Sequence, residues 1–477
     1  MSATDRGQQP EPQPEKEVNR PNGHTPHEPV PVVDVPESLA PQFSEDALAA
    51  KFTKKYGADM RFTAGMGRWF TWTGRVWKPD TTLQVYNRAR TICRAESAYC
   101  HEVRLARKVA SAATRSAVEQ LARSDPRHVV EVDQWDSNIW LLNTPDGIVD
   151  LKTGDIRPAR REDYCTKMTT IAPSVTAGCP QWLAFLNKVT KGDAALVGFL
   201  QRICGYALTG SIREEALFFL YGPGGNGKGT FLDTFVWVMG DYAQASAIET
   251  FIDTRGTRHP TELAKLQGAR LVTAVETEKD RYWSESRLKM LTGGDVIPAR
   301  YMRQDFFDFR PQFTLVIVGN HQPHFRTVNE AIRRRFYLVP FPVKIPDLER
   351  DEHLKEKLRG EGRGILHWCI NGCLDWQEKG LAAPLVVRDA TADYLHAEDN
   401  IQRWLDACCI QQPGQSTAFD GLWSSWCIWA EVAHVEAGSQ TSFALALQER
   451  NMTRDRKTSG SYYWGVRLRP DAEWQRY

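Results

Sequence analysis

Three short apolar runs in the middle of the chain predict the strands of one sheet. They span residues 216–221, 269–275 and 313–319, and segments with helical or loop character separate them. Strands that alternate with such segments are typical of a mostly parallel sheet with helices on its faces. We therefore predict an α/β domain over residues 211–346.

The preceding residues combine helical periodicity with β-type patterns. Residues 44–122 have a helical pattern, interrupted at residues 68–77 by a strand-like stretch whose Thr-Gly turn predicts a hairpin. Residues 140–154 alternate β-type residues with Pro-Asp-Gly and Thr-Gly turns, which predicts a small β-meander. Helical periodicity returns over residues 180–206. We predict a mixed α+β domain over residues 44–210, ending in a helical collar.

The two ends of the chain have different patterns. Residues 1–43 are rich in proline and polar residues and poor in aromatics, so they cannot bury enough apolar surface to offset the entropy of ordering. They are predicted to form a disordered leader. Residues 347–477 have a helical pattern until a strand-like stretch at residues 461–468. Helices followed by a hairpin favour a winged helix at this end.

Composition and charge narrow the class of protein. The chain has 477 residues, of which 42% are hydrophobic, so it can bury several cores at the usual domain size of about 100–200 residues. Its net charge of +1 creates no global field, so any nucleic-acid partner must be held by local basic patches. No apolar run approaches the roughly 18 residues that span a bilayer, and the N-terminus lacks a signal core. We expect a cytoplasmic protein without a membrane partner.

The first apolar run breaks into a glycine-rich loop that ends in lysine, which is typical of nucleoside triphosphate binding. Glycines let backbone N–H groups surround the β-phosphate, Lys228 reaches the β- and γ-phosphates, and the next helix offers its positive N-terminus. One position is unusual, because Gly229 stands where the Mg²⁺-coordinating hydroxyl normally follows the lysine and Thr230 comes one place later. The residues expected to bind ATP are Gly222, Pro223, Gly224, Gly225, Asn226, Gly227, Lys228, Gly229 and Thr230.

Polar residues follow the other two apolar runs. Glu276 ends the second run and Glu278 comes two residues later. A carboxylate at this edge of a parallel sheet either holds Mg²⁺ or polarises the attacking water, and Glu276 is the better candidate because it ends the strand directly. Asn320 ends the third run, where its amide can orient the water against the γ-phosphate. Thr230 and Glu276 are the predicted metal ligands.

Cationic residues lie on both sides of the third run. Arg334 and Arg335, in a run of three arginines, are either a solvated cluster or fingers that reach the γ-phosphate of a neighbouring subunit. The second interpretation implies an oligomer. Residues 288–309 carry a Gly-Gly-Asp turn and interleaved basic and aromatic residues, which favours an exposed hairpin that grips a nucleic-acid backbone. Near the C-terminus there is a further group of cations, and two interpretations of it are equally supported: the side chains contact phosphates, or they belong to a charged turn. These residues are Arg450, Arg454, Arg456 and Lys457.

The order of these motifs resembles the superfamily 3 helicase domain of phage and plasmid primase-helicases and of the poxvirus-type replicative NTPases. The resemblance rests on the glycine-rich loop, Glu276, a Lys289-x-Leu-Thr-Gly-Gly-Asp stretch, Asn320 and the Arg-Arg-Phe sequence that begins at Arg334. Residues 142–154 and 199–210 resemble the domain that precedes the helicase in this family. The implied fold class is α/β: an AAA+-like P-loop NTPase core with a preceding mixed α+β domain and a C-terminal helical and winged-helix region.

The resemblance also implies a function and roles for the residues. It implies a hexameric DNA helicase that uses ATP and Mg²⁺, translocates 3′ to 5′ on single-stranded and forked DNA, and works with host or phage replication proteins in a bacterial cell. Asn320 is the implied sensor, and Arg334 or Arg335 the finger supplied in trans. The DNA-tracking hairpin maps to residues 300–309, and the implied DNA contacts are Lys289, Arg300 and Arg303.

Two alternatives stay open beside the replicative helicase. One is a DNA-stimulated ATPase that loads or remodels at an origin, and the other is a winged-helix initiator whose assembly is driven by ATP. Family members with primase activity carry a separate upstream catalytic domain, whose clustered acids serve two-metal nucleotidyl transfer. The residues upstream of the helicase motifs are here assigned to the leader and the pre-helicase domain, so we expect no primer synthesis by this polypeptide.

Overall fold

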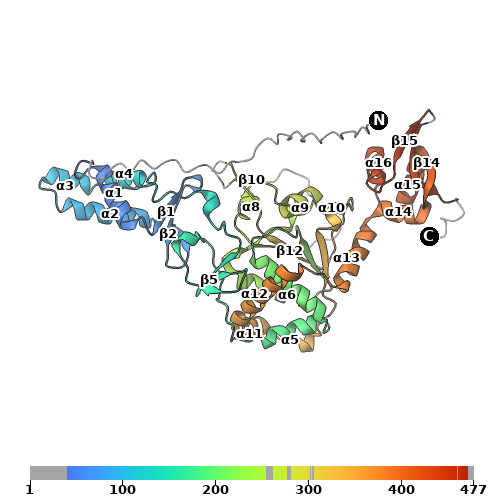
Figure 1. The fold of residues 1–477 in the computed structure, drawn as a ribbon, viewed down its shortest axis with the longest axis horizontal. Coiled ribbons are helices and arrows are strands. Elements are labelled where there is room, and N and C mark those ends of the chain that lie inside the picture. Colours follow the sequence, from blue (N-terminus) through green and yellow to red (C-terminus); the bar gives the residue numbers. More distant parts are fainter. Residues whose placement is uncertain are drawn as a thin grey trace, which may run out of the picture.

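A computed structural model shows a central α/β body with a smaller unit at each end (Figure 1). The helix α13, Leu385–Glu398, leads from the body to the C-terminal unit. The predicted leader, residues 1–43, lies outside the described residues except for residues 40–43. The structure describes residues 40–253, 261–276, 281–300, 302, 306–458 and 460–470.

A five-stranded sheet lies at the centre of the body, and all of its neighbouring strands are parallel. The strand order is β13-β7-β12-β9-β8, so the first strand along the chain lies between the fourth and the fifth. The chain runs from β7 across the sheet to β8, returns through β9 to β12, and then passes β7 to reach β13 on its other side. The carboxyl end of β7 therefore lies at a topological switch point, where open α/β sheets bind ligands. The strands are β7 Leu217–Tyr221, β8 Ala243–Ala245, β9 Leu271–Val275, β12 Thr314–Gly319 and β13 Phe336–Pro340. The predicted mixed α/β class with a parallel sheet is confirmed.

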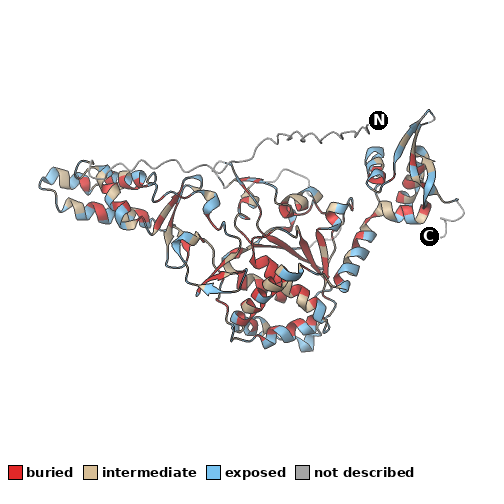
Figure 2. Cartoon of the chain, viewed as in Figure 1, coloured by how far each residue is buried: buried red, intermediate tan, exposed pale blue. Residues whose placement is uncertain are grey.

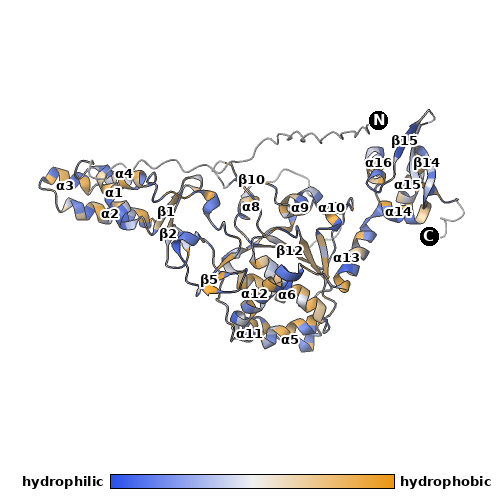
Figure 3. Ribbon diagram, viewed as in Figure 1, coloured by the Kyte–Doolittle hydropathy of each residue, from blue (hydrophilic) through white to orange (hydrophobic). Residues whose placement is uncertain are grey.

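The sheet is buried on both faces, which is why its strands read as continuous apolar runs. Side chains of β7 alternate between two cores: Phe218 and Leu220 join one core, whereas Leu217 and Phe219 join the other. Figure 2 shows the buried strands at the centre of the body, and Figure 3 shows hydrophobic residues on these strands and on the helices around them. Helices α5 Pro180–Val189, α6 Ala194–Leu208, α7 Lys228–Met239 and α12 Gly362–Lys379 contribute to the first core. The second core includes residues of α8 Thr261–Ala264, α9 Glu285–Thr292, α10 Glu330–Arg333, β10 Ile297–Arg300 and β11 Phe306–Phe309.

Helices from before and after the sheet pack together in the first core. An added Cβ on Gly205 of α6 would lie 2.0 Å from the backbone nitrogen of Cys373 in α12. An added Cβ on Gly372 would lie 2.1 Å from the carbonyl oxygen of Gln201. The two helices can therefore approach this closely only because glycine occupies both positions. The core continues across residue 346, where the sequence predicts a domain boundary.

The N-terminal unit has the predicted mixture of helices and short antiparallel strands. β2 pairs with β3 as the expected hairpin, and β4, β5 and β6 form the expected meander. The helices are α1 Glu45–Tyr56, α2 Gln84–Ser97, α3 Val103–Val109 and α4 Ala112–Ala122. The strands are β1 Met60–Thr63, β2 Arg68–Trp72, β3 Trp77–Pro79, β4 Leu141–Thr144, β5 Gly147–Asp150 and β6 Ile156–Arg157.

The C-terminal unit has its own core and a three-stranded antiparallel sheet in the order β14-β16-β15. The prediction that this region is helical up to residue 461 is wrong, because a ten-residue strand, β14, precedes two of its helices. The sequence carries no strand signal for β14, because its middle, Gln-Gln-Pro-Gly-Gln, is exposed and lacks apolar alternation. The elements are α14 Asn400–Cys408, β14 Cys409–Ala418, α15 Phe419–Val432, α16 Gln440–Gln448, β15 Arg454–Lys457 and β16 Gly460–Leu468.

Among the helices that the structure describes, none combines enough length with enough apolar character to span a membrane. The remaining helix of the body, α11 Leu354–Gly360, connects the sheet region to α12.

Candidate functional site

The glycine-rich loop joins β7 to α7 at the carboxyl edge of the sheet. Gly227 has φ of 89°, and an added Cβ there would lie 2.6 Å from Cγ1 of Val189. Gly222 is as restricted, since its added Cβ would lie 2.4 Å from the carbonyl oxygen of Phe341. Asn226 donates from Nδ2 to that same oxygen at 3.0 Å, which ties the loop to the end of β13. The loop conformation therefore depends on glycine at two positions and on one buried amide.

Lys228 is a buried ammonium surrounded by neutral oxygens. Its Nζ donates to the carbonyl of Gly222 at 2.6 Å and to the side-chain oxygens of Asn226 and Asn320, both at 3.1 Å. The residue is 4% exposed. Burial lowers the pKa of Lys228 from 10.5 to about 8, because the charged form loses hydration. Within the described part of the chain, no carboxylate forms an ion pair with this ammonium.

A cleft of about 370 Å³ opens beside the loop and Lys228. This volume falls in the range of small-molecule sites. The cleft is lined by Gly224, Gly225, Asn226, Gly227, Lys228, Gly229, Thr230, Asp233, Val318, Asn320 and Lys355. Most of the predicted nucleotide-binding residues thus share one cavity, although the sequence motifs did not point to Asp233 or Lys355.

Glu276 directly follows β9, and Asn320 directly follows β12, the strand that pairs with β9. The backbone nitrogen of Glu276 donates to the carbonyl of Val318 at 2.8 Å, and the residue is 3% exposed. An added Cβ on Gly319 would lie 3.1 Å from Cβ of Glu276. The structure therefore brings Lys228, Asn320 and Glu276 to one edge of the sheet. Glu278, the second predicted carboxylate, lies outside the described residues.

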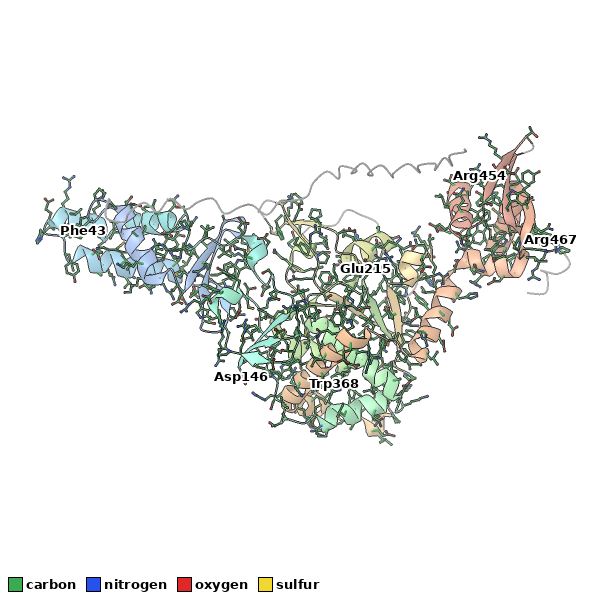
Figure 4. The ribbon with its side chains drawn as sticks, in the orientation of Figure 1. Phe43, Asp146, Glu215, Trp368, Arg454 and Arg467 are labelled. Carbon is green, nitrogen blue, oxygen red and sulfur yellow. The ribbon has the colours of Figure 1, made fainter. Side chains whose placement is uncertain are left out.

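Arg334 and Arg335 lie at the opposite edge of the sheet from the loop. They precede β13, whose first residue pairs with Leu217 at the start of β7. A strand rises about 3.3 Å per residue, so the length of β7 places these arginines roughly 15 Å from their own loop. Both contact Glu215, labelled in Figure 4, with guanidinium-to-Oε2 distances of 3.2 Å for Arg334 and 2.5 Å for Arg335. The side chain of Arg334 is 59% exposed and that of Arg335 is 9% exposed.

The predicted DNA-binding residues occupy two elements. Lys289 is half-buried in α9, whereas Arg300 ends β10, which forms an antiparallel hairpin with β11. The Arg300 guanidinium lies 5.0 Å from the ring of Phe306, within cation–π range. Met302 and Phe306 are exposed at the outer end of this hairpin. Arg303 lies outside the described residues.

Two protein-family models match the sequence. The model described as D5 N terminal like matches residues 49–191, and a family of unknown function, DUF5906, matches residues 220–335. The second match includes the glycine-rich loop, Glu276, Asn320 and both candidate finger arginines. The two matches follow one another along the chain, in the same order as the N-terminal unit and the sheet.

Viral proteins are among the curated relatives. The chain is 24% identical over 304 residues to "Putative helicase L207/L206" of Acanthamoeba polyphaga mimivirus, a match that covers 59% of this chain and 31% of that protein. It is 26% identical over 242 residues to "Putative helicase 121R" of Invertebrate iridescent virus 3, covering 47% of this chain and 26% of that protein. The chain thus spans about a third or less of the length of these relatives.

One solved structure aligns with most of the chain. The apo structure of the NrS-1 C-terminal region aligns with 88% of this chain and 98% of its own, at 10% identity and a TM-score of 0.49. The parallel sheet with its helical layers defines a mixed α/β protein. Within that class, the D5 match over residues 49–191 and the helicase-named viral relatives support the predicted resemblance to D5-like primase-helicases of superfamily 3.

Proposed function

We propose that this chain is the subunit of an ATP-hydrolysing DNA helicase. The observation that carries the proposal is the environment of Lys228, a buried ammonium whose partners in the described structure are neutral oxygens and which lines a cleft rich in glycine. Such a cation lacks a counter-charge, and a polyphosphate supplies one. The α7 N-terminus adds the positive end of a twelve-residue helix at the same place.

The cleft has the space that phosphate groups need. An added Cβ on Gly224 or on Gly229 would meet nothing within 4 Å, so the cleft side of the loop is open. Backbone N–H groups of such a loop can approach phosphate oxygens without a side chain between them. Gly222 and Gly227, where a side chain would clash, thus shape the loop, whereas Gly224 and Gly229 leave room for the ligand.

The residues present also fit a Mg²⁺ ion that arrives with the nucleotide. Mg²⁺ is usually held by one or two carboxylates together with substrate phosphates. Thr230 lines the cleft, and Glu276 directly follows β9 at the same edge of the sheet. The carboxylate of Asp233, which also lines the cleft, forms an ion pair with Lys355 at 2.5 Å. The described residues include no group of three or more side chains ready to hold a metal without other ligands. When bound, the ion supplies neutralisation of phosphate charge.

Asn320 and Glu276 are proposed to position the attacking water. The Asn320 oxygen accepts from Lys228, so its amide nitrogen is directed to act as a donor toward the γ-phosphate or the water. Glu276 is the proposed general base, because a carboxylate at this strand end can accept a proton from water held between the two side chains.

A neighbouring subunit is proposed to complete the site. The candidate finger arginines lie at the far edge of their own sheet, so a role at a γ-phosphate requires another copy of the chain. Arg334 is the better candidate, because Arg335 is almost buried and is committed to Glu215 at 2.5 Å. Head-to-tail contacts of this kind close into rings, and a hexamer is the proposed assembly.

The β10–β11 hairpin is the proposed contact with single-stranded DNA. Its exposed Phe306 and cationic Arg300 combine a stacking surface with phosphate attraction, and Arg303 and Lys289 are proposed further contacts. The C-terminal unit has the element order of a winged helix, α14-β14-α15-α16-β15-β16, and Figure 4 shows Arg454 and Arg467 on its strands.

The initiator alternative is less well supported than the helicase. A winged helix that reads duplex DNA usually inserts its third helix into the major groove, with cations beside the phosphates. The exposed residues of α16 include no lysine or arginine: they are Gln440, Thr441, Ser442, Leu445 and Gln448. Arg450, which follows α16, is instead paired with buried Asp399 at 2.5 Å. The phosphate contact considered for Arg450 is therefore not available in this structure.

Strand displacement on a forked duplex tests the proposal. Wild type should hydrolyse ATP and separate the strands, and Lys228→Ala should lose both activities. Lys379→Ala, which removes an exposed cation paired with Asp375 on α12, is the matched control and should keep both. ATP hydrolysis without displacement would favour the loader, whereas ATP-independent binding to one duplex sequence would favour the initiator.

A further inference from the structure

The segment that follows β13 covers the outer side of the glycine-rich loop. The backbone nitrogen of Ile345 donates to the carbonyl of Gly225 at 2.9 Å. An added Cβ on Gly225 would lie 2.6 Å from Nη2 of Arg350, so this guanidinium lies directly against the loop backbone. Ten residues after Ile345, Lys355 in α11 lines the cleft itself. Two cations more than a hundred residues away in sequence thus reach the same loop.

Both cations are held by carboxylates at the rim of the cleft. Arg350 contacts Oδ1 of Asp347 at 2.6 Å, and Lys355 contacts Oδ2 of Asp233 at 2.5 Å. All four side chains are about half exposed or more. Exposed pairs of this kind contribute little to stability, so either cation can exchange its carboxylate for another anion at low cost.

We propose that Arg350 and Lys355 contact the phosphate groups of the bound nucleotide, in addition to Lys228. The inference rests on the proposed nucleotide-binding function of the cleft. A di- or triphosphate carries more negative charge than one carboxylate and offers more acceptor oxygens, so it displaces Asp347 and Asp233 from the two cations. Arg350 lies on the Gly225 side of the loop, whereas Lys355 approaches from the side of α7 that carries Asp233.

The charges that line the cleft support this assignment. Of the lining residues, Lys228 and Lys355 are the cations and Asp233 is the acid. Asp233 therefore has an effect opposite in sign to that of Lys355 on any anion in the cleft. If the Lys355–Asp233 pair only held α11 against α7, removing either partner would have the same effect.

Equilibrium titration of the 477-residue chain with a fluorescent ADP and a non-hydrolysable ATP analogue tests the proposal. Arg350→Ala and Lys355→Ala should each weaken binding about tenfold, the effect of one charge-assisted hydrogen bond. Asp233→Asn should tighten binding or leave it unchanged. Lys357→Ala is the matched control, because Lys357 lies on the same helix, pairs with Asp351 at 2.6 Å and is not among the cleft-lining residues.

The outcomes separate this inference from the proposed function. If wild type binds nucleotide and Lys228→Ala does not, while Arg350→Ala and Lys355→Ala bind like Lys357→Ala, the inference is wrong and the function stands. Equal weakening by Asp233→Asn and Lys355→Ala would also overturn it, because only a structural pair predicts equal effects. If wild type binds neither nucleotide, the proposed function fails first. Thermal unfolding of each variant shows that the comparison is made on folded protein.

Discussion

Asp399 and Arg333 form an ion pair that connects the C-terminal unit to the arginine run of the central body. Nη2 of Arg333 lies 2.8 Å from Oδ2 of Asp399, which is 3% exposed. The other carboxylate oxygen accepts from Arg450 at 2.5 Å and from the backbone nitrogen of Gln402 at 3.0 Å. One buried carboxylate thus holds α10, the start of α14 and the end of α16 together. The C-terminal unit is therefore linked directly to the residue that precedes Arg334.

Asp399→Ala should destabilise the protein by about 2–4 kcal/mol, because it leaves two guanidinium groups without their carboxylate and removes the N-cap of α14. Urea unfolding followed by tryptophan fluorescence measures the change. Asp406→Ala is the matched control: this carboxylate on the same helix is exposed and contacts His396 at 3.2 Å, so its loss should cost about 0.5 kcal/mol or less. Equal costs for the two variants would contradict the bridging role of Asp399.

Gly205→Ala should destabilise the protein by at least about 2 kcal/mol, because its methyl group would overlap the backbone of α12 and force the two helices apart. Chemical denaturation provides the measurement. In Gly360→Ala the new methyl group meets nothing within 4 Å, so this helical control should be neutral or slightly stabilising. A Gly205→Ala variant as stable as Gly360→Ala would show that α6 and α12 do not pack as described.

The stability of the ligand-free protein should depend on Lys228 above about pH 8. Because burial lowers the folded-state pKa to about 8 from 10.5, the unfolded chain holds this proton more tightly than the folded chain. The cost of burying the charge is fully present below pH 8 and is relieved as the pH rises toward 10.5. Unfolding free energies measured across this window for wild type and Lys228→Met should therefore differ in slope, with the wild type rising more steeply. Parallel curves would show that the pKa of Lys228 is not lowered.

The apolar runs and turns predicted most of the central fold, because strands buried on both faces and tight turns have strong local signals. The glycine-rich loop, Glu276 and Asn320 could be located for the same reason, since each directly follows a strand. β14 could not be located from the sequence, because an exposed strand with Pro and Gly in its middle has no apolar alternation. Arg350 and Lys355 have no local signal in the sequence, because only tertiary packing brings α11 and the residues before it to the loop.

The pairing of Asp399 with Arg333 and Arg450 was equally inaccessible from the sequence. Its three members lie on separate helices or their ends, more than fifty residues apart at each step. Nothing in the run of three arginines distinguishes Arg333 from its neighbours, yet the structure gives each a different environment. Arg334 is the most exposed of the three, which is why we propose it, and not Arg333 or Arg335, for contact with a neighbouring subunit.

Mixing two inactive variants tests whether Arg334 serves a neighbouring subunit. Arg334→Ala should lower the ATPase rate on the order of a thousandfold, as loss of an arginine finger does, and Lys228→Ala should be inactive. In mixed assemblies, some sites combine the intact Lys228 of one subunit with the intact Arg334 of the next, so ATPase activity should reappear and be greatest at intermediate ratios. Arg335→Ala should instead lower stability, because it removes the guanidinium that holds Glu215 at 2.5 Å. If no ratio restores activity although both variants assemble, the two residues do not share a site across subunits.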